Sequence, residues 1–388
     1  MAESNGDRSL RWYSTREPII LIVLSLMAAL FFLAVSALSA RFHAQQESLG
    51  ENWFRRATKD REAGHLERAI SEFQAAEQYS RANFLYQLNL AQTLAAQGRT
   101  DEAYSYLLNL RERQPDDGTV NLDLARVLAR KGEAGQATRY YHNALYAVWP
   151  NEPEKHRRAV RFELIEFLLA GNAKTQAQSE LIAMAANLPE DAGMHKRVGD
   201  LFLQAQDPDH ALPQFREALR LDRRDAAAWA AAGRAAFELG KYPEARRYLE
   251  STVAENPGES ASSKLLETVT LVLEMDPYRR PISAKRRDGS VLEAFATAGQ
   301  RLKACHPEGV TAASTASGTA PEPSLEARWK QMQPGVTALG LRRNPDLADK
   351  AMDLVFVIEQ ETSATCGAPT GKDLALLLIS KLHEGTGK

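Results

Sequence analysis

The sequence has little of what catalytic and metal-binding proteins need. Only two of its 388 residues are cysteines, and they do not form a C-x-x-C pair. The eight histidines contain no H-x-x-x-H pair, so neither a metal site nor a haem site is indicated. A G-x-S-x-G nucleophile motif is also absent, and no pair of carboxylates stands out. We therefore expect no catalytic residue, no cofactor, no metal ion and no enzymatic activity.

The sequence also lacks an excess of either charge. Charged residues make up 25% of the chain and the formal net charge is −2. Nothing in this balance favours nucleic acid as a partner. Electrostatic specificity, where the protein has it, must therefore be local.

One long uncharged run lies near the N-terminus. Residues 19–40 contain no Asp, Glu, Lys or Arg, and a helix of that length spans about 33 Å, enough for a hydrocarbon core of about 30 Å. The small residues at 37–40 also fit the cut site of a secretory signal peptide, but the apolar core of such peptides usually has about 7–15 residues. We favour an uncleaved transmembrane helix in contact with a lipid bilayer.

The expected topology follows from the flanks of this helix. Arg8, Arg11 and Arg16 precede it, which favours a cytoplasmic tail over residues 1–18. A linker is expected at 41–49, and the rest of the chain is expected outside the cytoplasm, because long domains translocate largely regardless of charge. Abundant arginine and alanine are typical of GC-rich bacteria, so we expect a bacterial inner membrane and a periplasmic bulk.

A repeat of 34 residues dominates the centre of the chain. Six alanines keep one phase, with steps of 34, 34, 40, 34 and 34 residues: Ala69, Ala103, Ala137, Ala177, Ala211 and Ala245. Four positions later each repeat has a large apolar residue: Phe73, Leu107, Tyr141, Leu181, Phe215 and Leu249. Twelve positions before each alanine the residue is small in five of six repeats: Ala57, Ala91, Ala125, Ile165, Gly199 and Gly233. This period is typical of stacked helical hairpins in which small residues allow close crossings and large ones fill the gaps.

These residues resemble the tetratricopeptide repeat (TPR) family, whose 34-residue pattern is W-L-G-Y-A-F-A-P. The resemblance covers residues 50–259 and implies an all-α fold with a solenoid of about six units. The expected units are 50–83, 84–117, 118–157, 158–191, 192–225 and 226–259. Gly64, Gly98, Gly132, Asn172 and Gly240 are expected in the turns within the hairpins. The step of 40 residues places an insertion near residues 149–153, which is either a surface loop or part of a binding face.

The resemblance also implies a binding surface, because the first helices of successive TPR units line a concave groove. Aligned on that pattern, seven residues are candidates for contact with a protein or peptide partner: Asn89, Gln92, Arg126, Glu166, Arg197, Asp200 and Arg234. Their mixed charges suit a peptide with polar and apolar anchors better than a polyanion. One TPR subfamily clamps a terminal carboxylate with lysine, arginine and asparagine at set positions in three consecutive units, and that set is not found here.

The C-terminal third matches no family that we recognise. A helix over residues 260–276 is expected to cap the array, and a basic linker is expected at 277–289. Residues 290–388 are expected to form a small helical bundle, with helices over 291–304, 325–332, 345–365 and 372–383 and a flexible loop at 306–324. Cys305 and Cys366 each end one of these helices, so in an oxidising compartment they could form a disulfide.

The function that we expect is a membrane-anchored scaffold that binds an extended peptide or a helix in the groove, outside the cytoplasm. Within the same class, the chain resembles anchored TPR subunits of cytochrome c maturation or other envelope-assembly factors. An alternative of another class is an enzyme or ligand-binding domain at the C-terminus that the repeats target. Neighbouring genes or captured partners would separate these possibilities.

Overall fold

The computed structural model describes the backbone of residues 10–305 and 324–384 and the side chains of residues 19–305 and 324–383. Every regular element in these ranges is a helix, which confirms the expected all-α fold. Extended pairing within the described ranges is limited to one isolated bridge, between Asp117 and Val148. The expected loop at 306–324, apart from its last residue, and the first nine residues of the expected tail lie outside the described residues.

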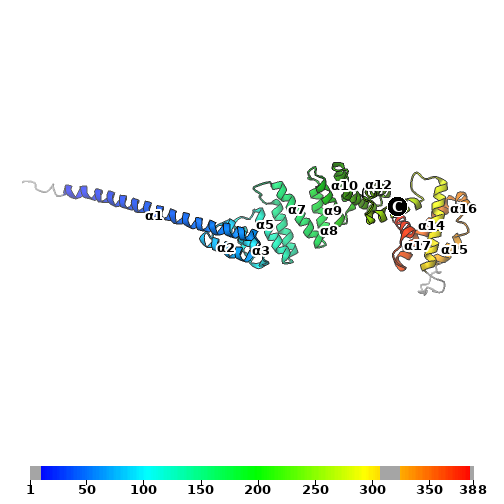
Figure 1. The fold of residues 1–388 in the computed structure, drawn as a ribbon, viewed down its shortest axis with the longest axis horizontal. Helices are drawn as coiled ribbons and strands as arrows, with labels where there is room; N and C mark the ends of the chain where they lie inside the picture. Colours follow the sequence, from blue (N-terminus) through cyan, green and yellow to red (C-terminus); the bar gives the residue numbers. More distant parts are fainter. Residues whose placement is uncertain (1–9, 306–323, 385–388) are drawn as a thin grey trace, which may run out of the picture. The chain divides into compact units, whose positions relative to one another are not determined.

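The chain divides into two compact units, residues 1–167 and 168–388. The first unit contains α1 (Leu10–Glu62), α2 (Leu66–Tyr79), α3 (Phe84–Ala96), α4 (Thr100–Arg113), α5 (Gly118–Arg130), α6 (Ala134–Tyr146) and most of α7 (Pro153–Ala170). The second contains α8 (Lys174–Ala185), α9 (Ala192–Gln204), α10 (Pro208–Leu221), α11 (Ala226–Glu238), α12 (Tyr242–Glu255), α13 (Ser260–Met275), α14 (Ala284–Cys305), α15 (Leu325–Met332), α16 (Ala338–Arg343), α17 (Pro345–Thr365) and α18 (Gly371–Glu384). Figure 1 shows these elements in sequence order. The expected fourth repeat, 158–191, is therefore divided between the two units.

Short polar signals begin and end the helices of the repeats. The side chain of Asn83 accepts hydrogen bonds from the backbone N–H groups of Leu85 and Tyr86, and Asp117, Asp191 and Asp225 cap later first helices in a similar way. Such caps satisfy N–H groups that have no partner inside the helix. The turn residues expected from the sequence all have positive φ, from 57° at Asn172 to 86° at Gly98. The turn of the fifth repeat instead uses Gln206, with φ 61°, which the sequence pattern does not indicate.

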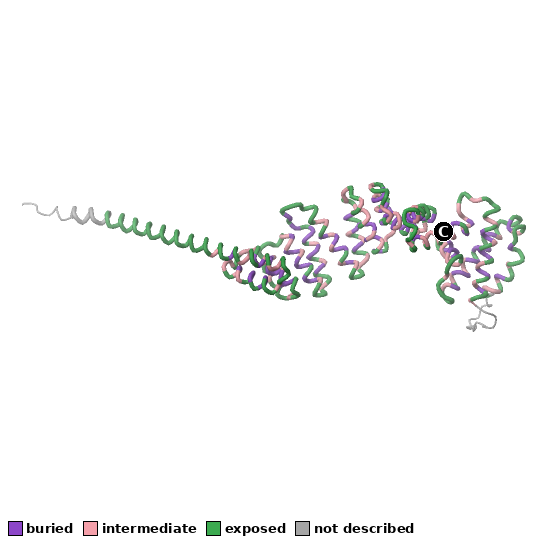
Figure 2. Tube along the Cα trace, in the orientation of Figure 1, coloured by how far each residue is buried: buried purple, intermediate pink, exposed green. Residues whose placement is uncertain are grey.

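The core of the repeats is built from the periodic positions. All six phase-setting alanines have no exposed surface, and the large residues four positions later are buried as well. Gly199 and Gly233 show why the residue twelve positions before the alanine is small. A Cβ at these two sites would lie 2.7 Å from the side chains of Phe215 and Leu249, respectively. Only glycine allows the helices to approach this closely at these two positions. Figure 2 shows the resulting alternation of buried and exposed positions along the helices.

Helix α1 is continuous from Leu10 to Glu62, so the expected linker at 41–49 is helical (Figure 1). No glycine or proline lies between residues 19 and 49, and nothing else in that stretch interrupts helical hydrogen bonding. The span that begins at Ile19 is long and apolar enough to cross a membrane or to be a signal sequence, and none of its most apolar window is buried. The far end of α1 packs on the repeats, where the ring of Phe54 lies 5.6 Å from that of Phe73 and 5.0 Å from that of Tyr86.

The insertion in the third repeat is held against the neighbouring turn. The N–H of Val148 donates to the carbonyl of Asp116 (2.9 Å), and Trp149 packs on Gly118, where a Cβ would collide with the indole. The indole also stacks on His156, with ring centroids 4.5 Å apart, and donates its N–H to the carbonyl of Ala144. The insertion is therefore an anchored structural loop.

The C-terminal helices close the second unit. Helix α13 packs against α12 on one side and against α18, the last helix of the chain, on another. Helices α15 and α17 have the expected bounds, whereas α16 was not expected. The expected basic linker at 277–289 is helical from residue 284, because the hydroxyl of Ser283 accepts the N–H of Arg286 and starts α14 earlier than the apolar pattern suggests.

Candidate functional site

The seven groove candidates all lie on first helices of the repeats: α3, α5, α7, α9 and α11. Asn89 on α3 is almost fully buried and contacts other parts of the array. Its side-chain oxygen accepts a hydrogen bond from Arg61 (2.7 Å), and its amide donates to the carbonyl of Leu85. Glu166 and Arg197 are exposed but already engage other residues. The remaining four candidates line two pockets, one in each compact unit.

The first pocket lies in the first compact unit, has a volume of about 370 Å³, and is lined by α3, α4 and α5. It is lined by Gln92 and Arg126 together with Asp123, which the repeat pattern does not indicate as a groove residue. Gln92 donates to Asp123 (2.7 Å), and Arg126 forms two parallel hydrogen bonds of 2.8 Å with the carboxylate of Glu163. Asp123 and Arg126 of this pocket are therefore already bonded within the protein.

The pKa values in this network follow from burial and pairing. Burial raises the pKa of Asp123 above its usual value, despite hydrogen bonds from Gln92 and Arg126. Burial would also raise the pKa of Glu163, but the hydrogen bonds and charge of Arg126, with a further bond from Tyr141, lower it overall. A bidentate pair with Arg126 keeps Glu163 ionised and holds both side chains in place.

The second pocket, which we call the alanine pocket, lies in the second compact unit and has a volume of about 550 Å³. It is lined from the first helices α9 and α11, from α12, and from α13 and the turn that precedes it. Its lining is Lys196, Asp200, Ala226, Ala227, Ala230, Ala231, Arg234, Thr252, Asn256, Glu259, Ala261, Ser262 and Leu265. Since alanine is the smallest side chain with a Cβ, the run on α11 leaves a hollow where larger residues would fill the space.

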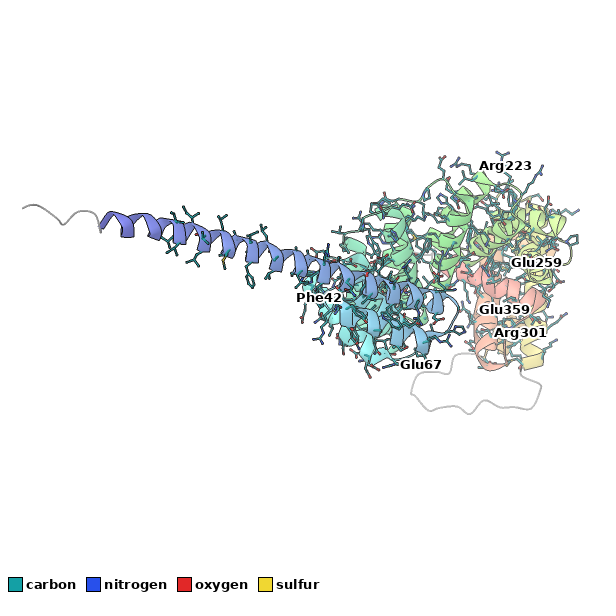
Figure 3. All side chains as sticks on the ribbon, turned by 60° about the vertical axis from the view of Figure 1, so that its left-hand side comes forward. Phe42, Glu67, Arg223, Glu259, Arg301 and Glu359 are labelled. Atoms are coloured by element: carbon teal, nitrogen blue, oxygen red, sulfur yellow. A yellow bond between two sulfur atoms is a disulfide. The ribbon has the colours of Figure 1, made fainter. Side chains whose placement is uncertain are left out.

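Two charged residues of the alanine pocket, Arg234 and Glu259, form no ion pair with any residue that the structure describes. Lys196 and Asp200 pair with each other over 2.9 Å. Arg234 is exposed, and no hydrogen bond or ion pair joins its side chain to any residue that the structure describes. At the rim, Glu259 (labelled in Figure 3) has a buried Oε2 atom with no hydrogen-bond partner among the described residues. The repeat pattern names Asp200 and Arg234 as candidates but not Glu259, which is the last residue of the sixth unit.

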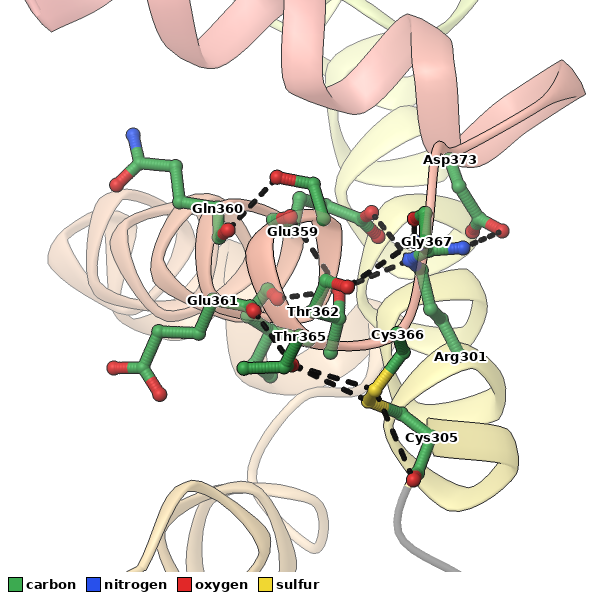
Figure 4. Close-up of polar contacts among 12 residues, drawn as sticks. Arg301, Cys305, Glu359, Gln360, Glu361, Thr362, Thr365, Cys366, Gly367 and Asp373 are labelled. Atoms are coloured by element: carbon green, nitrogen blue, oxygen red, sulfur yellow. Dashed lines mark hydrogen bonds and ion pairs between the residues drawn. A yellow bond between two sulfur atoms is a disulfide. The ribbon is translucent and has the colours of Figure 1, made fainter.

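A second cluster of polar groups joins α14, α17 and the start of α18 (Figure 4). Cys305 and Cys366 are joined as a disulfide, with their Cα atoms 5.6 Å apart. One turn before Cys305, Arg301 donates to the hydroxyl of Thr362 (2.9 Å) and to the carbonyl of Gly367 (2.8 Å). The disulfide and the guanidinium therefore hold the same two helix ends together.

The same arginine faces two carboxylates. Its Nε atom lies 3.6 Å from Oε2 of Glu359, and its Nη1 atom lies 3.6 Å from Oδ2 of Asp373. Glu359 has no exposed surface, and neither of its oxygens has a hydrogen-bond partner among the described residues. Burial and the charge of Asp373 raise the pKa of Glu359 to about 8, although Arg301 opposes the shift. Since Glu359 is enclosed, we assign this cluster a structural role. Within the described ranges, no three His, Cys, Asp or Glu side chains come together in a way that could hold a metal ion.

Comparison with solved structures returns many TPR proteins at low identity. YrrB, described as a TPR protein with an unusual peptide-binding site, is 18% identical over 49% of this chain and 95% of its own, with a TM-score of 0.39. The C-terminal part of a TPR repeat-containing protein from Cytophaga hutchinsonii is 14% identical over 63% of this chain and 94% of its own, with a TM-score of 0.44. PilF of Pseudomonas aeruginosa is 20% identical over 64% of this chain and 97% of its own, with a TM-score of 0.32.

The sequence itself also matches models of a known family. No curated protein matches the chain. Two models, both described as tetratricopeptide repeat, match residues 60–120 and 197–260. These ranges lie in the two halves of the periodic region and contain the hairpins α3/α4 and α11/α12. The repeats of the chain are therefore tetratricopeptide repeats.

Proposed function

We propose that this chain is a membrane-anchored scaffold that binds another protein through the groove formed by the first helices of its repeats. TPR proteins in general are scaffolds without enzymatic activity that bind protein partners. The observation that carries the proposal here is the alanine pocket, an open hollow of about 550 Å³ on the side of α9, α11 and α13. A hollow of this size with an apolar floor and a few polar groups suits an extended peptide or a helix.

The proposed anchor is the apolar part of α1. Residues 19–40 are fully helical and exposed along their whole length, so their side chains are not part of a protein core. Burial of such a surface in lipid removes a large apolar area from water, and all backbone groups are satisfied within the helix. A location outside the cytoplasm agrees with the disulfide of Cys305 and Cys366, because such bonds persist in oxidising compartments.

Two measurements test the anchor and its topology. We expect the chain to remain with membranes after alkaline extraction at its full mass, whereas a cleaved signal peptide would release a shorter soluble protein. A reporter active only in the periplasm, fused after Glu259, is expected to be active. Release of the protein, or an inactive reporter with an active cytoplasmic one at the same site, would contradict this part of the proposal.

Partner capture tests the groove. Ala227 lines the alanine pocket and is exposed, so Ala227→Trp fills the hollow without entering the core. Ala254 is an equally exposed alanine on α12 that does not line the pocket, and Ala254→Trp is the matched control. We expect partners captured from solubilised membranes to be lost with Ala227→Trp and retained with Ala254→Trp. Equal recovery with both variants would contradict binding in the groove, and turnover of a small molecule by the protein would favour a C-terminal enzyme.

A further inference from the structure

The charges and shape of the alanine pocket also indicate what it binds. We propose that the pocket selects extended peptides in which an apolar side chain lies next to an acidic one. This inference rests on the proposed function, since it names the peptide class for the same groove.

The floor of the pocket accounts for the apolar part. Ala226, Ala227, Ala230 and Ala231 present four methyl groups from one side of α11, and Leu265 adds an aliphatic side chain from α13. These groups offer no hydrogen bond to a ligand. A polar side chain placed there would lose water without a replacement, whereas an aliphatic side chain gains from leaving water.

Arg234 accounts for the acidic part. It follows Ala230 by four residues on α11, so both lie on the same face of the helix and Arg234 borders the floor. Its guanidinium is exposed and has no hydrogen bond or ion pair among the described residues, although its charge acts on Glu238, four residues further along α11. A planar guanidinium binds a carboxylate through two parallel hydrogen bonds, so an acidic side chain is its best-matched partner. The neighbouring cation, Lys196, is already paired with Asp200 and does not compete.

Glu259 also lines the pocket, beside α13. Its Oε2 atom lacks a hydrogen-bond donor among the described residues. The pocket thus offers a hydrogen-bond donor at Arg234 beside the methyl groups of α11.

The arginine of the first pocket is less available to a ligand than Arg234 of the alanine pocket. There the arginine at the equivalent repeat position, Arg126, is held by both oxygens of Glu163 at 2.8 Å and also contacts Asp123. An acidic ligand would have to displace this bidentate pair, which binding to Arg234 does not require.

The test uses the full chain in detergent and four fluorescein-labelled peptides with Gly-Ser flanks. Their central pairs are Leu-Asp, Leu-Asn, Leu-Lys and Ala-Asp. A charge-assisted pair with Arg234 is expected to make Leu-Asp bind about tenfold more tightly than Leu-Asn, with Leu-Lys weaker still. Ala-Asp is also expected to bind more weakly than Leu-Asp, because less apolar surface is buried.

Substitutions then identify the residue that reads the charge. Arg234→Ala is expected to remove the difference between Leu-Asp and Leu-Asn, and Arg234→Glu to make Leu-Lys the tightest ligand. Arg224→Glu, an equally exposed arginine outside the pocket, is the control and is expected to leave the order unchanged. Circular dichroism of each variant checks that the helices are intact.

The outcomes separate this inference from the proposed function. Peptides that bind without charge preference, or prefer lysine, and are still blocked by Ala227→Trp would overturn the inference but leave groove binding intact. Failure of Leu-Asp to bind at concentrations up to about 1 mM would also overturn it, while partner capture that depends on Ala227 would still support the scaffold. Binding of Leu-Asp that Ala227→Trp does not change would count against both.

Discussion

Replacement of Gly233 by alanine tests the packing on which the repeat array depends. A Cβ at residue 233 would lie 2.7 Å from Cδ2 and 2.8 Å from Cγ of Leu249, whose side chain is fully buried. Cγ is attached directly to the Cβ of Leu249, so it cannot swing aside as the end of a flexible chain can. The methyl group must therefore push α11 and α12 apart or force Leu249 from its rotamer.

The size of the effect follows from two opposing contributions. Overpacking of a filled core costs about 1–3 kcal/mol. Replacing glycine by alanine inside a helix returns about 0.5–1 kcal/mol, because the unfolded chain loses freedom. The net loss at Gly233 is then about 1 kcal/mol, close to a fivefold rise in the population of locally opened α11 and α12.

Hydrogen exchange followed by mass spectrometry measures this change where it occurs. We expect amides of α11 and α12 in Gly233→Ala to exchange about fivefold faster than in the parent chain. Gly289→Ala is the control: this exposed glycine lies within α14 with nothing within 4 Å of an added Cβ, so the same substitution should slow exchange there. Leu249→Ala should be less harmful in the Gly233→Ala background than alone, because the new methyl fills part of the cavity. Strictly additive effects, or unchanged exchange in Gly233→Ala, would refute the reasoning.

Three further predictions follow from other contacts. The pKa of Glu359 is raised to about 8 from 4.5, so between these pH values unfolding releases a proton. The free energy of unfolding should therefore fall as the pH rises from 4.5 to 8. Glu359→Gln should reduce this pH dependence, measured as the difference between urea midpoints at pH 5 and pH 8, and an unchanged difference would contradict the raised pKa. Cys305→Ser should abolish a mobility shift on non-reducing gels. It should also lower the free energy of unfolding by about 4 kcal/mol, because the disulfide joins residues 61 positions apart. A parent chain that migrates identically with and without reductant would exclude the bond. Trp149→Ala should cost about 3 kcal/mol and expose the turn at Gly118 to proteolysis, and wild-type resistance to protease would show that the insertion is not anchored by the indole.

The sequence by itself determined the helical repeats, because their packing is local. Each hairpin needs a small residue, a turn and a large residue at fixed spacings along the chain. Gly233, Gly240 and Leu249 can therefore be read from the spacing before any contact is known. The continuous apolar run at 19–40 is equally visible, since it depends on composition and length alone.

Only the tertiary structure decided which groove residues are available. Asn89, Arg126 and Arg234 occupy the same kind of helix face. Asn89 is held by Arg61 and Arg126 by Glu163, whereas Arg234 has no hydrogen bond or ion pair among the described residues. These partners lie 28 and 37 residues away in the sequence, and no local pattern encodes them. The return of α18 to α13, and the enclosure of Glu359 by helices from distant parts of the chain, depend on long-range burial in the same way.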